Sequence, residues 1–550
     1  MWMYSVAFHD THEADASMGP EANADSIRAL EKQIEEGKGN MIKLKRDRNS
    51  LLNISTLVPP EILGYIFVLS LGRENAWYFD GLEKGSYNFL LVCHHWFEVA
   101  SHTPELWSFW GNTLQDWKKR HHRSEATPLD LVLFGDESDP GVLFDEPLQN
   151  AVRSRVTQGT IRQVHLTSND GELLADIISS LTPDDDGSKN ENIESIILAS
   201  YGHITVDISD FFARSRFSKL RSLDLGGNLR ISSWNHLASL TTVLTTLSLH
   251  PSGLLSPLTL TASWLFSILT SNPTLQDLTL SDVTLLDDVD GSTVKVQLRS
   301  LKTLALKGEF RHLSILLRRL ILPEMLDKLD LVVSDPTVDE ISQTLAPYIQ
   351  DYFRRDPRFK GRLGVYASSS HDHISVAVGA VHTRTTIPGL KPPRVLLAVL
   401  TNHPPPDVLE QLLINLITLV PRDRVVFFDG DTDARVPQEL FFTMPNIETL
   451  CLTGLLLSEG FLQPDPAGPH ANTKLFPSLQ SLCLEDPIFQ NKDDWSHLMT
   501  YLVHQTSDGQ AISLEVVGDF PHGCPEMMRG IRGLVKEFTH HRDMEEEEEW

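Results

Sequence analysis

The 550-residue chain has only four cysteines, Cys93, Cys451, Cys483 and Cys524, and no two of them form a C-x-x-C pair. This usage favours a reducing compartment over a disulfide-stabilised secreted protein. The N-terminus lacks a basic segment followed by an apolar core, and no apolar run approaches the length of a membrane span. We therefore expect a protein of the cytoplasm or nucleus with no membrane partner.

Basic residues are also scarce, with 47 Lys and Arg against 74 Asp and Glu and a net charge of −27. Proteins that bind nucleic acid draw most of their affinity from basic surface, so a nucleic-acid partner is excluded and a basic protein surface is favoured. Part of the acidity lies in the run Glu545–Glu549, which predicts a solvated, disordered tail over 541–550. Residues 1–23 are expected to form a disordered N-terminus.

Catalytic motifs are missing as well: there is no G-x-x-x-x-G-K-S/T loop, no H-E-x-x-H and no G-x-S-x-G. The acidic stretch beginning at Asp429 resembles the start of a calcium loop. However, Ala434 occupies the position that needs glycine, and Leu440 the one that needs a bidentate glutamate. His371 and His373 could supply two metal ligands, but no third can be assigned. We predict no enzymatic activity, no cofactor and no metal.

The stretch 58–107 carries the strongest pattern, VPPEILGYIFVLS followed after a spacer by LLVCHHWFEVASHTPELW. Prolines at its start suit the first turn of a helix, and Glu61 suits the helix dipole there. Apolar residues then recur at helical spacing in both halves, and Thr103-Pro104 ends the second half. The pattern predicts two amphipathic helices separated by a link.

These residues resemble an F-box, whose pattern is roughly L-P-x-E-I/L-L-x-x-I-F, then V-C-x-x-W-x-x-x-A, then P-x-L-W. The matching positions are Pro59, Glu61, Ile62, Leu63, Ile66, Phe67, Val92, Cys93, Trp96, Ala100, Pro104, Leu106 and Trp107. The chain departs from the pattern at Val58, where leucine is usual, at His94, where a basic residue is common, and in the longer link around 72–86.

The resemblance implies an F-box over 55–110 that docks on a Skp-type adaptor, which in turn holds a cullin scaffold. The residues expected to bind the adaptor are Pro59, Ile62, Leu63, Ile66, Phe67, Val92, Cys93, Trp96 and Trp107. The alternative is that these are ordinary core helices of a larger domain.

Downstream, the phrase L-x-x-L-x-L recurs at intervals of roughly 24–32 residues, close to the period of leucine-rich repeats. The copies, which we call leucine phrases, are 161–166, 193–198, 220–225, 244–249, 275–280, 301–306, 326–331, 447–452 and 479–484. Because a strand has a period of two, the last two apolar residues of each phrase should point inward and the residues between them outward. The segments 236–243, 263–273 and 311–323 have apolar residues at helical spacing. They are predicted to be the return segments, which lead from the end of one strand to the start of the next.

We therefore predict an α/β fold in which the helical F-box is followed by a leucine-rich-repeat solenoid at 128–540, with parallel strands on the concave face and helical or irregular returns. Irregular repeats are expected at 337–430, where LGVYAS, HISVAVGAV and DRVVFFDG still predict strands. The outward strand positions of a solenoid form an extended binding surface. The substrate-binding positions predicted there are Ser222, Asp224, Thr246, Ser248, Asp277, Thr279, Lys328 and Asp330.

The segment 24–53 has apolar residues in an a/d heptad register, interrupted at Gly37 and Arg48. One interpretation is a short coiled coil that gives a dimer. The other, which we favour, is an amphipathic helix that packs on its own F-box, because Gly37 and the Gly39-Asn40 pair weaken a continuous helix.

Cys451 and Cys483 occupy the same place in two leucine phrases, IETLCL and LQSLCL. They should face outward on neighbouring parallel strands, with Cα atoms closer than the roughly 7 Å limit for a disulfide. A reducing compartment and the sideways orientation of strand side chains favour free thiols.

Together these patterns resemble the large fungal group of F-box proteins with degenerate leucine-rich repeats. That resemblance implies a substrate-recognition subunit of a Skp–cullin–F-box ubiquitin ligase that binds an unknown protein substrate and supplies no catalytic residue. The alternative is a non-degradative interaction scaffold without ligase association.

Overall fold

The structure is a computed structural model that describes most of the chain. The described residues are 20–50, 58–70, 90, 92–110, 122–124, 127–135, 146–183, 190–232, 234, 243–250, 258–286, 295–369, 373–380, 394–400, 406–432, 438–453, 474–485, 492–507, 509–518 and 525–541. The predicted link at 72–86, nearly all of the return segment 236–243, most of the predicted N-terminal and C-terminal tails, and His371 lie outside them. The chain divides into two compact units, Met1–Pro128 and Leu129–Trp550.

The described part of the first unit is mainly helical. Its elements are α1 (Pro20–Ser50), α3 (Pro60–Ser70), α5 (His94–Ser101), α6 (Pro104–Trp107) and the short strand β1 (Phe109–Trp110). Helix α1 runs unbroken through Gly37 and Gly39, so the two glycines that were expected to weaken the helix do not end it. Each glycine costs about 1 kcal/mol relative to alanine, and a 31-residue helix has enough other helix formers to offset that cost.

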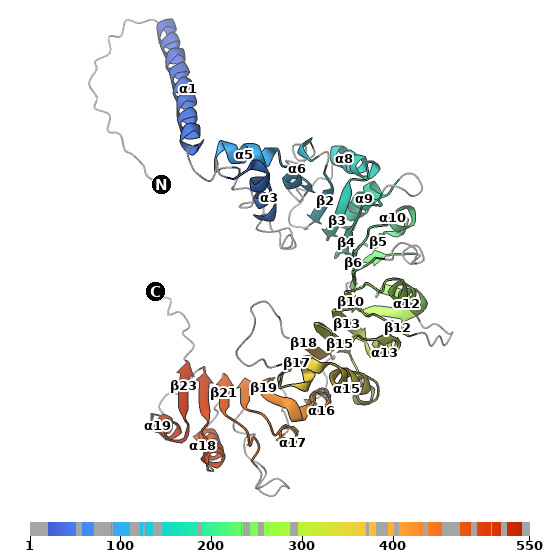
Figure 1. Cartoon of the computed structure of the whole chain (residues 1–550), viewed down its shortest axis with the longest axis vertical. Coiled ribbons are helices and arrows are strands. Elements are labelled where there is room, and N and C mark those ends of the chain that lie inside the picture. The colour runs from blue at the N-terminus through green and yellow to red at the C-terminus, as the bar shows by residue number, and fades with distance from the viewer. Residues whose placement is uncertain are drawn as a thin grey trace, which may run out of the picture. The chain divides into compact units, whose positions relative to one another are not determined.

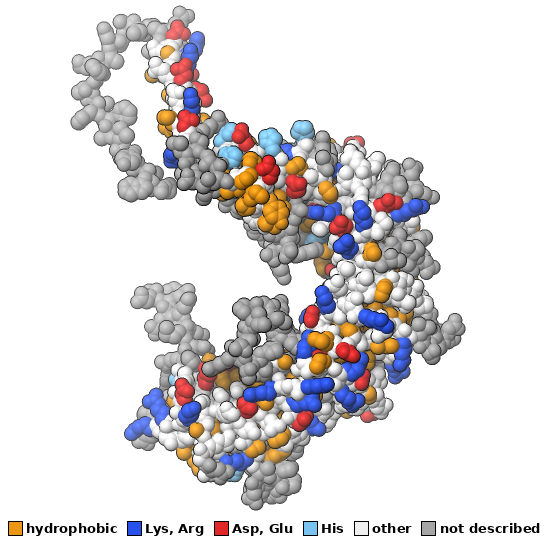
Figure 2. Space-filling model, viewed as in Figure 1, with side chains coloured by type: hydrophobic (Ala, Val, Ile, Leu, Met, Phe, Trp, Pro, Cys, Tyr) orange, Lys and Arg blue, Asp and Glu red, His pale blue; other side chains and the backbone are white. Residues whose placement is uncertain are grey.

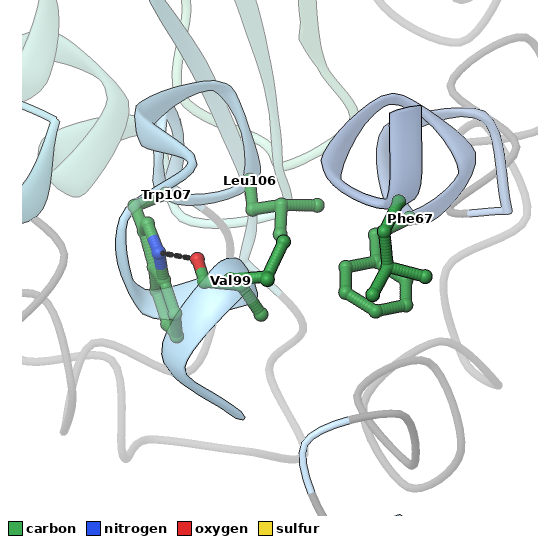
Figure 3. Close-up of a cluster of buried hydrophobic side chains, with 6 residues drawn as sticks. Phe67, Val99, Leu106 and Trp107 are labelled. Carbon is green, nitrogen blue, oxygen red and sulfur yellow. Dashed lines mark hydrogen bonds between the residues drawn. The ribbon is translucent and has the colours of Figure 1, made fainter. Parts of the chain in front are cut away.

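The core of the helical unit is built by α3, α5 and α6 (Figure 3). Phe67 of α3 faces Val99 and Leu106, and the Phe67 ring lies 5.1 Å from that of Trp96 between centroids. The Trp107 indole Nε1 donates a hydrogen bond of 2.8 Å to the Ala100 carbonyl, so the ring is buried without leaving its donor unpaired. This cluster fixes how the two predicted helices pack.

The second unit is a mixed α/β structure around a large, mostly parallel sheet. In spatial order its strands are β2 (Leu129–Gly135), β3 (Ile161–Ser168), β4 (Ser195–Ser200), β6 (Ser222–Gly227), β8 (Thr246–His250), β10 (Asp277–Ser281), β13 (Thr303–Glu309), β15 (Lys328–Ser334), β18 (Arg394–Leu400), β17 (His373–Ala380), β16 (Leu363–Ser369), β19 (Val425–Thr432), β20 (Thr449–Thr453), β21 (Ser481–Glu485), β22 (Ser513–Val517) and β23 (Glu537–His541).

The last two apolar residues of all nine leucine phrases lie in strands of this sheet and face inward as predicted. Leu223 pairs with Leu247 and Leu225 with Leu249 in the register of β6 and β8, and the same alignment continues strand after strand. The inward residues are buried, while the residues between them are half-exposed except for buried Cys451. Each strand therefore shares its apolar side with both neighbours.

Helices connect the strands and lie along the outer side of the sheet in Figure 1. They are α8 (Glu146–Thr157), α9 (Gly171–Leu181), α10 (Ser209–Arg214), α12 (Ala262–Ser271), α13 (Phe310–Arg319), α14 (Val338–Glu340), α15 (Ala346–Arg355), α16 (Pro406–Thr418), α17 (Gln438–Phe442), α18 (Lys492–Thr506) and α19 (Pro525–Leu534). Single helical turns lie at η5 (Ile341–Leu345), η6 (Pro357–Lys360) and η7 (Arg422–Arg424).

The connections also contain three short two-stranded parallel sheets. In these, β5 (Val206–Asp207) pairs with β7 (Leu229–Arg230), β9 (Leu258–Thr261) with β11 (Val283–Leu286), and β12 (Val296–Gln297) with β14 (Leu320–Ile321). The predicted helical returns at 263–273 and 311–323 correspond to α12 and α13. Buried Asn272 ends α12, where its side-chain Nδ2 donates to the Ile268 carbonyl at 2.9 Å and its Oδ1 accepts from the Leu244 amide at 3.0 Å. One side chain thus joins a helix end to the preceding leucine phrase.

The parallel order is interrupted between β15 and β19. The three predicted strands are present as β16, β17 and β19, but β17 runs antiparallel to both β16 and β18. Strand β15 pairs with β18, and β16 pairs with β19. Each of these pairs therefore joins two strands that are separated by two other strands in the sequence. The irregularity predicted at 337–430 therefore takes the form of one reversed strand and an exchanged strand order.

No helix within the described ranges combines the length and the apolar character needed to cross a membrane.

Candidate functional site

Helix α3 and the start of α5 carry large apolar side chains that remain accessible. Figure 2 shows hydrophobic side chains gathered over this part of the helical unit. We call this set the exposed helical face; its members are Ile62, Tyr65, Ile66, Leu69, Val92 and Phe97. Ile62 is 53% exposed and Ile66 46% exposed. Apolar surface of this kind on a small unit is typical of protein-binding sites.

The predicted adaptor-binding residues divide between this face and the core. Ile62, Ile66, Val92 and Pro59 are exposed, whereas Trp96 and Cys93 are half-buried. Leu63 and Phe67 are each only 2% exposed, and Trp107 is also buried in the core. These three side chains support the helix packing and are buried in this chain, so their role as adaptor contacts stays a prediction.

The division follows from how closely α3 approaches the turn between α5 and α6. A Cβ added at Gly64 would lie 2.6 Å from the Thr103 hydroxyl oxygen, so the backbone of α3 contacts that turn directly. The same hydroxyl donates a hydrogen bond of 2.8 Å to the Val99 carbonyl. The side of α3 that bears Leu63, Gly64 and Phe67 is thereby turned inward and the opposite side outward.

Two local features hold the start of α5 in place. Cys93 is the N-cap residue, and its sulfur accepts a hydrogen bond from the Trp96 amide at 3.5 Å. Trp96 then packs on the core cluster. Cys93 therefore has a structural role at the edge of the exposed helical face.

The heptad positions of α1 remain exposed. They include Ile27, Leu30, Ile34, Met41 and Leu44, each more than half exposed. The structure does not bury them on the helical unit, so the favoured interpretation of α1 as a helix packed on its own F-box is not what the structure shows. The coiled-coil interpretation stays a prediction.

The predicted substrate-binding residues lie on the side of the sheet opposite the buried leucines, which we call the polar face. Asp224 is level with Ser248 and Thr279, and Asp330 continues the row two strands further on. The complete predicted set is half-exposed or exposed: Ser222, Asp224, Thr246, Ser248, Asp277, Thr279, Lys328 and Asp330. They lie on β6, β8, β10 and β15 in rows that run across the sheet, with β13 between β10 and β15.

Several of these groups already have partners within the face. The Asp224 carboxylate lies 2.6 Å from His250 Nε2, and this contact raises the pKa of His250 above its usual value. Lys328 and Asp330 form an ion pair on β15. Burial lowers the pKa of His165, on β3, to about 4. His165 and His250 were missed because a lone histidine in a strand carries no sequence signal.

An aromatic pair on the polar face was also missed. Tyr366 of β16 is half-exposed at the surface, and its ring lies 5.3 Å from that of Phe427 on β19. Sequence reasoning could not place them together, because the pairing of β16 with β19 depends on the exchanged strand order. Exposed aromatic residues of this kind often dominate the binding energy of an interface.

Comparisons of the chain with protein-family models and with curated proteins find no match.

Proposed function

We propose that this chain is an F-box substrate receptor of a Skp–cullin–F-box ubiquitin ligase. In this proposal α3, α5 and α6 form the F-box, and the sheet unit is a leucine-rich-repeat solenoid that binds the substrate. The observation that carries the proposal is the exposed helical face, which includes Ile62, Ile66 and Val92, three residues that match the F-box pattern. A helix pair that satisfies its own core yet exposes these positions is suited to dock on another protein.

The chemistry of such a receptor is indirect. Holding a substrate beside a charged ubiquitin-conjugating enzyme raises the effective concentration of the substrate lysine, so no catalytic residue is needed on this chain. The adaptor would bind the exposed helical face, and the cullin would bind the adaptor. The receptor contributes position and specificity.

The polar face of the sheet supports the other half of the proposal. Parallel strands in register present side chains in continuous rows, which suits recognition of an extended protein surface. Tyr366 and Phe427 offer an aromatic anchor within those rows. Since the chain carries a net charge of −27, a basic segment of the substrate is favoured.

The test is capture of the adaptor and cullin by the full-length chain. The informative variant is Ile62→Ala with Ile66→Ala, because both side chains are exposed and their loss leaves the core intact. Leu63 is unsuitable, since truncating a buried leucine would unfold the unit. The matched control is Ile204→Ala in the sheet unit, which removes an isoleucine of similar exposure, 48%.

We expect the wild type and Ile204→Ala to capture adaptor and cullin equally and the double variant to lose at least about tenfold in adaptor affinity, as expected when buried interface residues are truncated. Equal capture by all three proteins would remove the adaptor assignment. The wild type should also be captured from cells with and without proteasome inhibition. If it then brings down a protein partner but no adaptor or cullin, the result would favour the non-degradative scaffold.

A further inference from the structure

Two cysteines and a glutamate meet on the polar face near the C-terminal end of the sheet. Cys451 of β20 is the direct partner of Cys483 on β21, as predicted for neighbouring strands, and both are free thiols. Glu485 lies two residues beyond Cys483 on the same side of β21. The two Sγ atoms and a carboxylate oxygen of Glu485 all lie within 4.8 Å of one another. The strand register produces this cluster from three residues that show no metal-binding spacing in the sequence.

The donor set fits a borderline-soft cation. Thiolates select for metals such as zinc and copper(I), while a carboxylate ligand favours the divalent ion of the two. Around a tetrahedral zinc ion, ligand atoms lie roughly 3.5 Å apart, given metal–sulfur and metal–oxygen bonds of about 2.3 and 2.1 Å. Small rotations of the side chains would bring the three ligand atoms, now within 4.8 Å of one another, to that separation. The strands β20 and β21 would stay in place, because their backbones are paired by hydrogen bonds.

Charge favours a cation at the same point. Asp429 pairs with Cys451 across β19 and β20, and Glu515 pairs with Cys483 across β21 and β22, so acidic side chains flank both thiols. A divalent cation at this point would compensate the negative charge of these acidic side chains.

Burial adds a further argument. Cys451 is buried and Cys483 half-buried, and the Glu485 carboxylate accepts a hydrogen bond of 3.2 Å from Thr453 on the next strand. Thr453 therefore orients the carboxylate, as an outer-shell residue does around a metal. No basic side chain forms an ion pair with Glu485 among the described residues, so a cation would be its first positive partner.

We propose that Cys451, Cys483 and Glu485 form a zinc-binding site on the polar face. On binding, each Sγ–H bond breaks, the protons pass to solvent, and both sulfurs donate an electron pair to the metal without any redox change. The fourth position of the ion remains for water or for a donor side chain of a bound protein. The site is independent of the proposed ligase function, because it rests on the sheet unit alone.

The test is zinc titration of the reduced, metal-free, full-length protein against a chromogenic chelator. We expect one tightly bound equivalent and the release of up to about two protons, since both thiols deprotonate. Cobalt(II) in place of zinc should give a thiolate-to-metal charge-transfer band. Cys451→Ser and Cys483→Ser should each lose at least about 100-fold in affinity, and Glu485→Gln about tenfold, by comparison with the 10–100-fold cost of losing an outer-shell partner.

The matched controls are Cys93→Ser, which keeps an N-cap of the same shape, and Cys524→Ser, at a position outside the described residues. Both should bind zinc as the wild type does. Circular dichroism in the presence of a chelator checks that each variant folds, and the cobalt spectrum of the wild type decides the matter if a cysteine variant does not fold. Each of three results would overturn the site. The first is equal zinc binding by the wild type and by the double variant that carries both Cys451→Ser and Cys483→Ser. The second is a cobalt complex without a thiolate band, and the third is a Cys451–Cys483 disulfide whose reduced form takes up no zinc.

Discussion

The helical unit leaves apolar side chains exposed that the sheet unit would bury. Ile62, Tyr65 and Leu69 follow an amphipathic helical pattern yet are more than half exposed, whereas Leu278 and Leu304 of the sheet are fully buried. The difference comes from the number of neighbours. A strand within the sheet is covered by strands on both sides and by a connecting helix, while α3 is covered on one side only. Periodicity therefore predicts which residues share a face, and only packing decides whether that face is covered.

The largest effect expected within this comparison is at Phe67. Phe67→Ala should lower the free energy of unfolding of the helical unit by about 3–5 kcal/mol, because it removes a buried ring that packs on Trp96. Ile62→Ala, its exposed neighbour on α3, should cost less than about 1 kcal/mol. Urea unfolding followed by tryptophan fluorescence measures both. Similar losses in the two variants would mean that the two sides of α3 are not distinguished by packing.

The corresponding test in the sheet is at β13. Leu304→Ala should cost about 3 kcal/mol, within the range for truncating a buried leucine, because Leu304 is enclosed by Leu278 and Leu329 on the adjacent strands. Thr303→Ala, one residue earlier on the polar face, should cost under about 0.5 kcal/mol. The measurement is the shift in thermal unfolding midpoint. If Thr303→Ala lowered the unfolding midpoint more than Leu304→Ala, the buried face of β13 would be the one that carries Thr303, contrary to the structure.

A pH dependence should distinguish two histidines of the polar face. His165 has a lowered folded-state pKa of about 4, so as pH falls below 6.5 the unfolded chain takes up its proton first and stability is lost. By pH 5 this loss is about 2 kcal/mol, and His165→Gln should remove it. Denaturant unfolding between pH 8 and pH 5 is the measurement.

His250 should act with the opposite sign. Its pKa is raised by Asp224, so its stabilisation is complete below pH 6.5 and is lost as the pH rises through the folded-state value. His250→Gln should therefore flatten the alkaline side of the profile and leave the acidic side unchanged. An unchanged alkaline side in this variant would show that the Asp224 contact does not favour protonated His250.

The smallest effect concerns two helical glycines. Gly37→Ala should stabilise α1 by about 0.5–1 kcal/mol, since a Cβ there would meet nothing within 4 Å and alanine favours the helix. Gly64→Ala should instead destabilise the helical unit, because its Cβ would clash with Thr103. Amide hydrogen exchange of α1, and thermal unfolding for Gly64, give the two signs. Stabilisation by both variants would show that the turn between α5 and α6 can move away from α3.

The sequence predicts the strands of the sheet well because a leucine phrase repeats one environment many times. Its period of two and its spacing determine which residues face inward and which strands are neighbours, including the pairing of Cys451 with Cys483. The helical unit is harder to predict, since Leu63 and Ile66 are equally apolar and only the contact at Gly64 decides which of them is buried.

Isolated long-range contacts are the least predictable. The Tyr352 hydroxyl accepts a hydrogen bond of 3.2 Å from the Leu326 amide, 26 residues earlier in the chain, and donates one of 3.1 Å to buried Asp356. The exchanged order of β16 and β18 likewise depends on contacts between distant segments. No periodic pattern marks either feature, because each occurs once.

The exchanged order also has a consequence for synthesis of the chain. A regular parallel array can add each strand as it leaves the ribosome, but the free edge of β15 has no partner until β18 has emerged. The corresponding edge of β16 waits in turn for β19. During that interval two unpaired strand edges are open to other chains, which exposes the nascent protein to aggregation. A chaperone that shields strand edges should therefore be needed most while residues 335–432 are being translated.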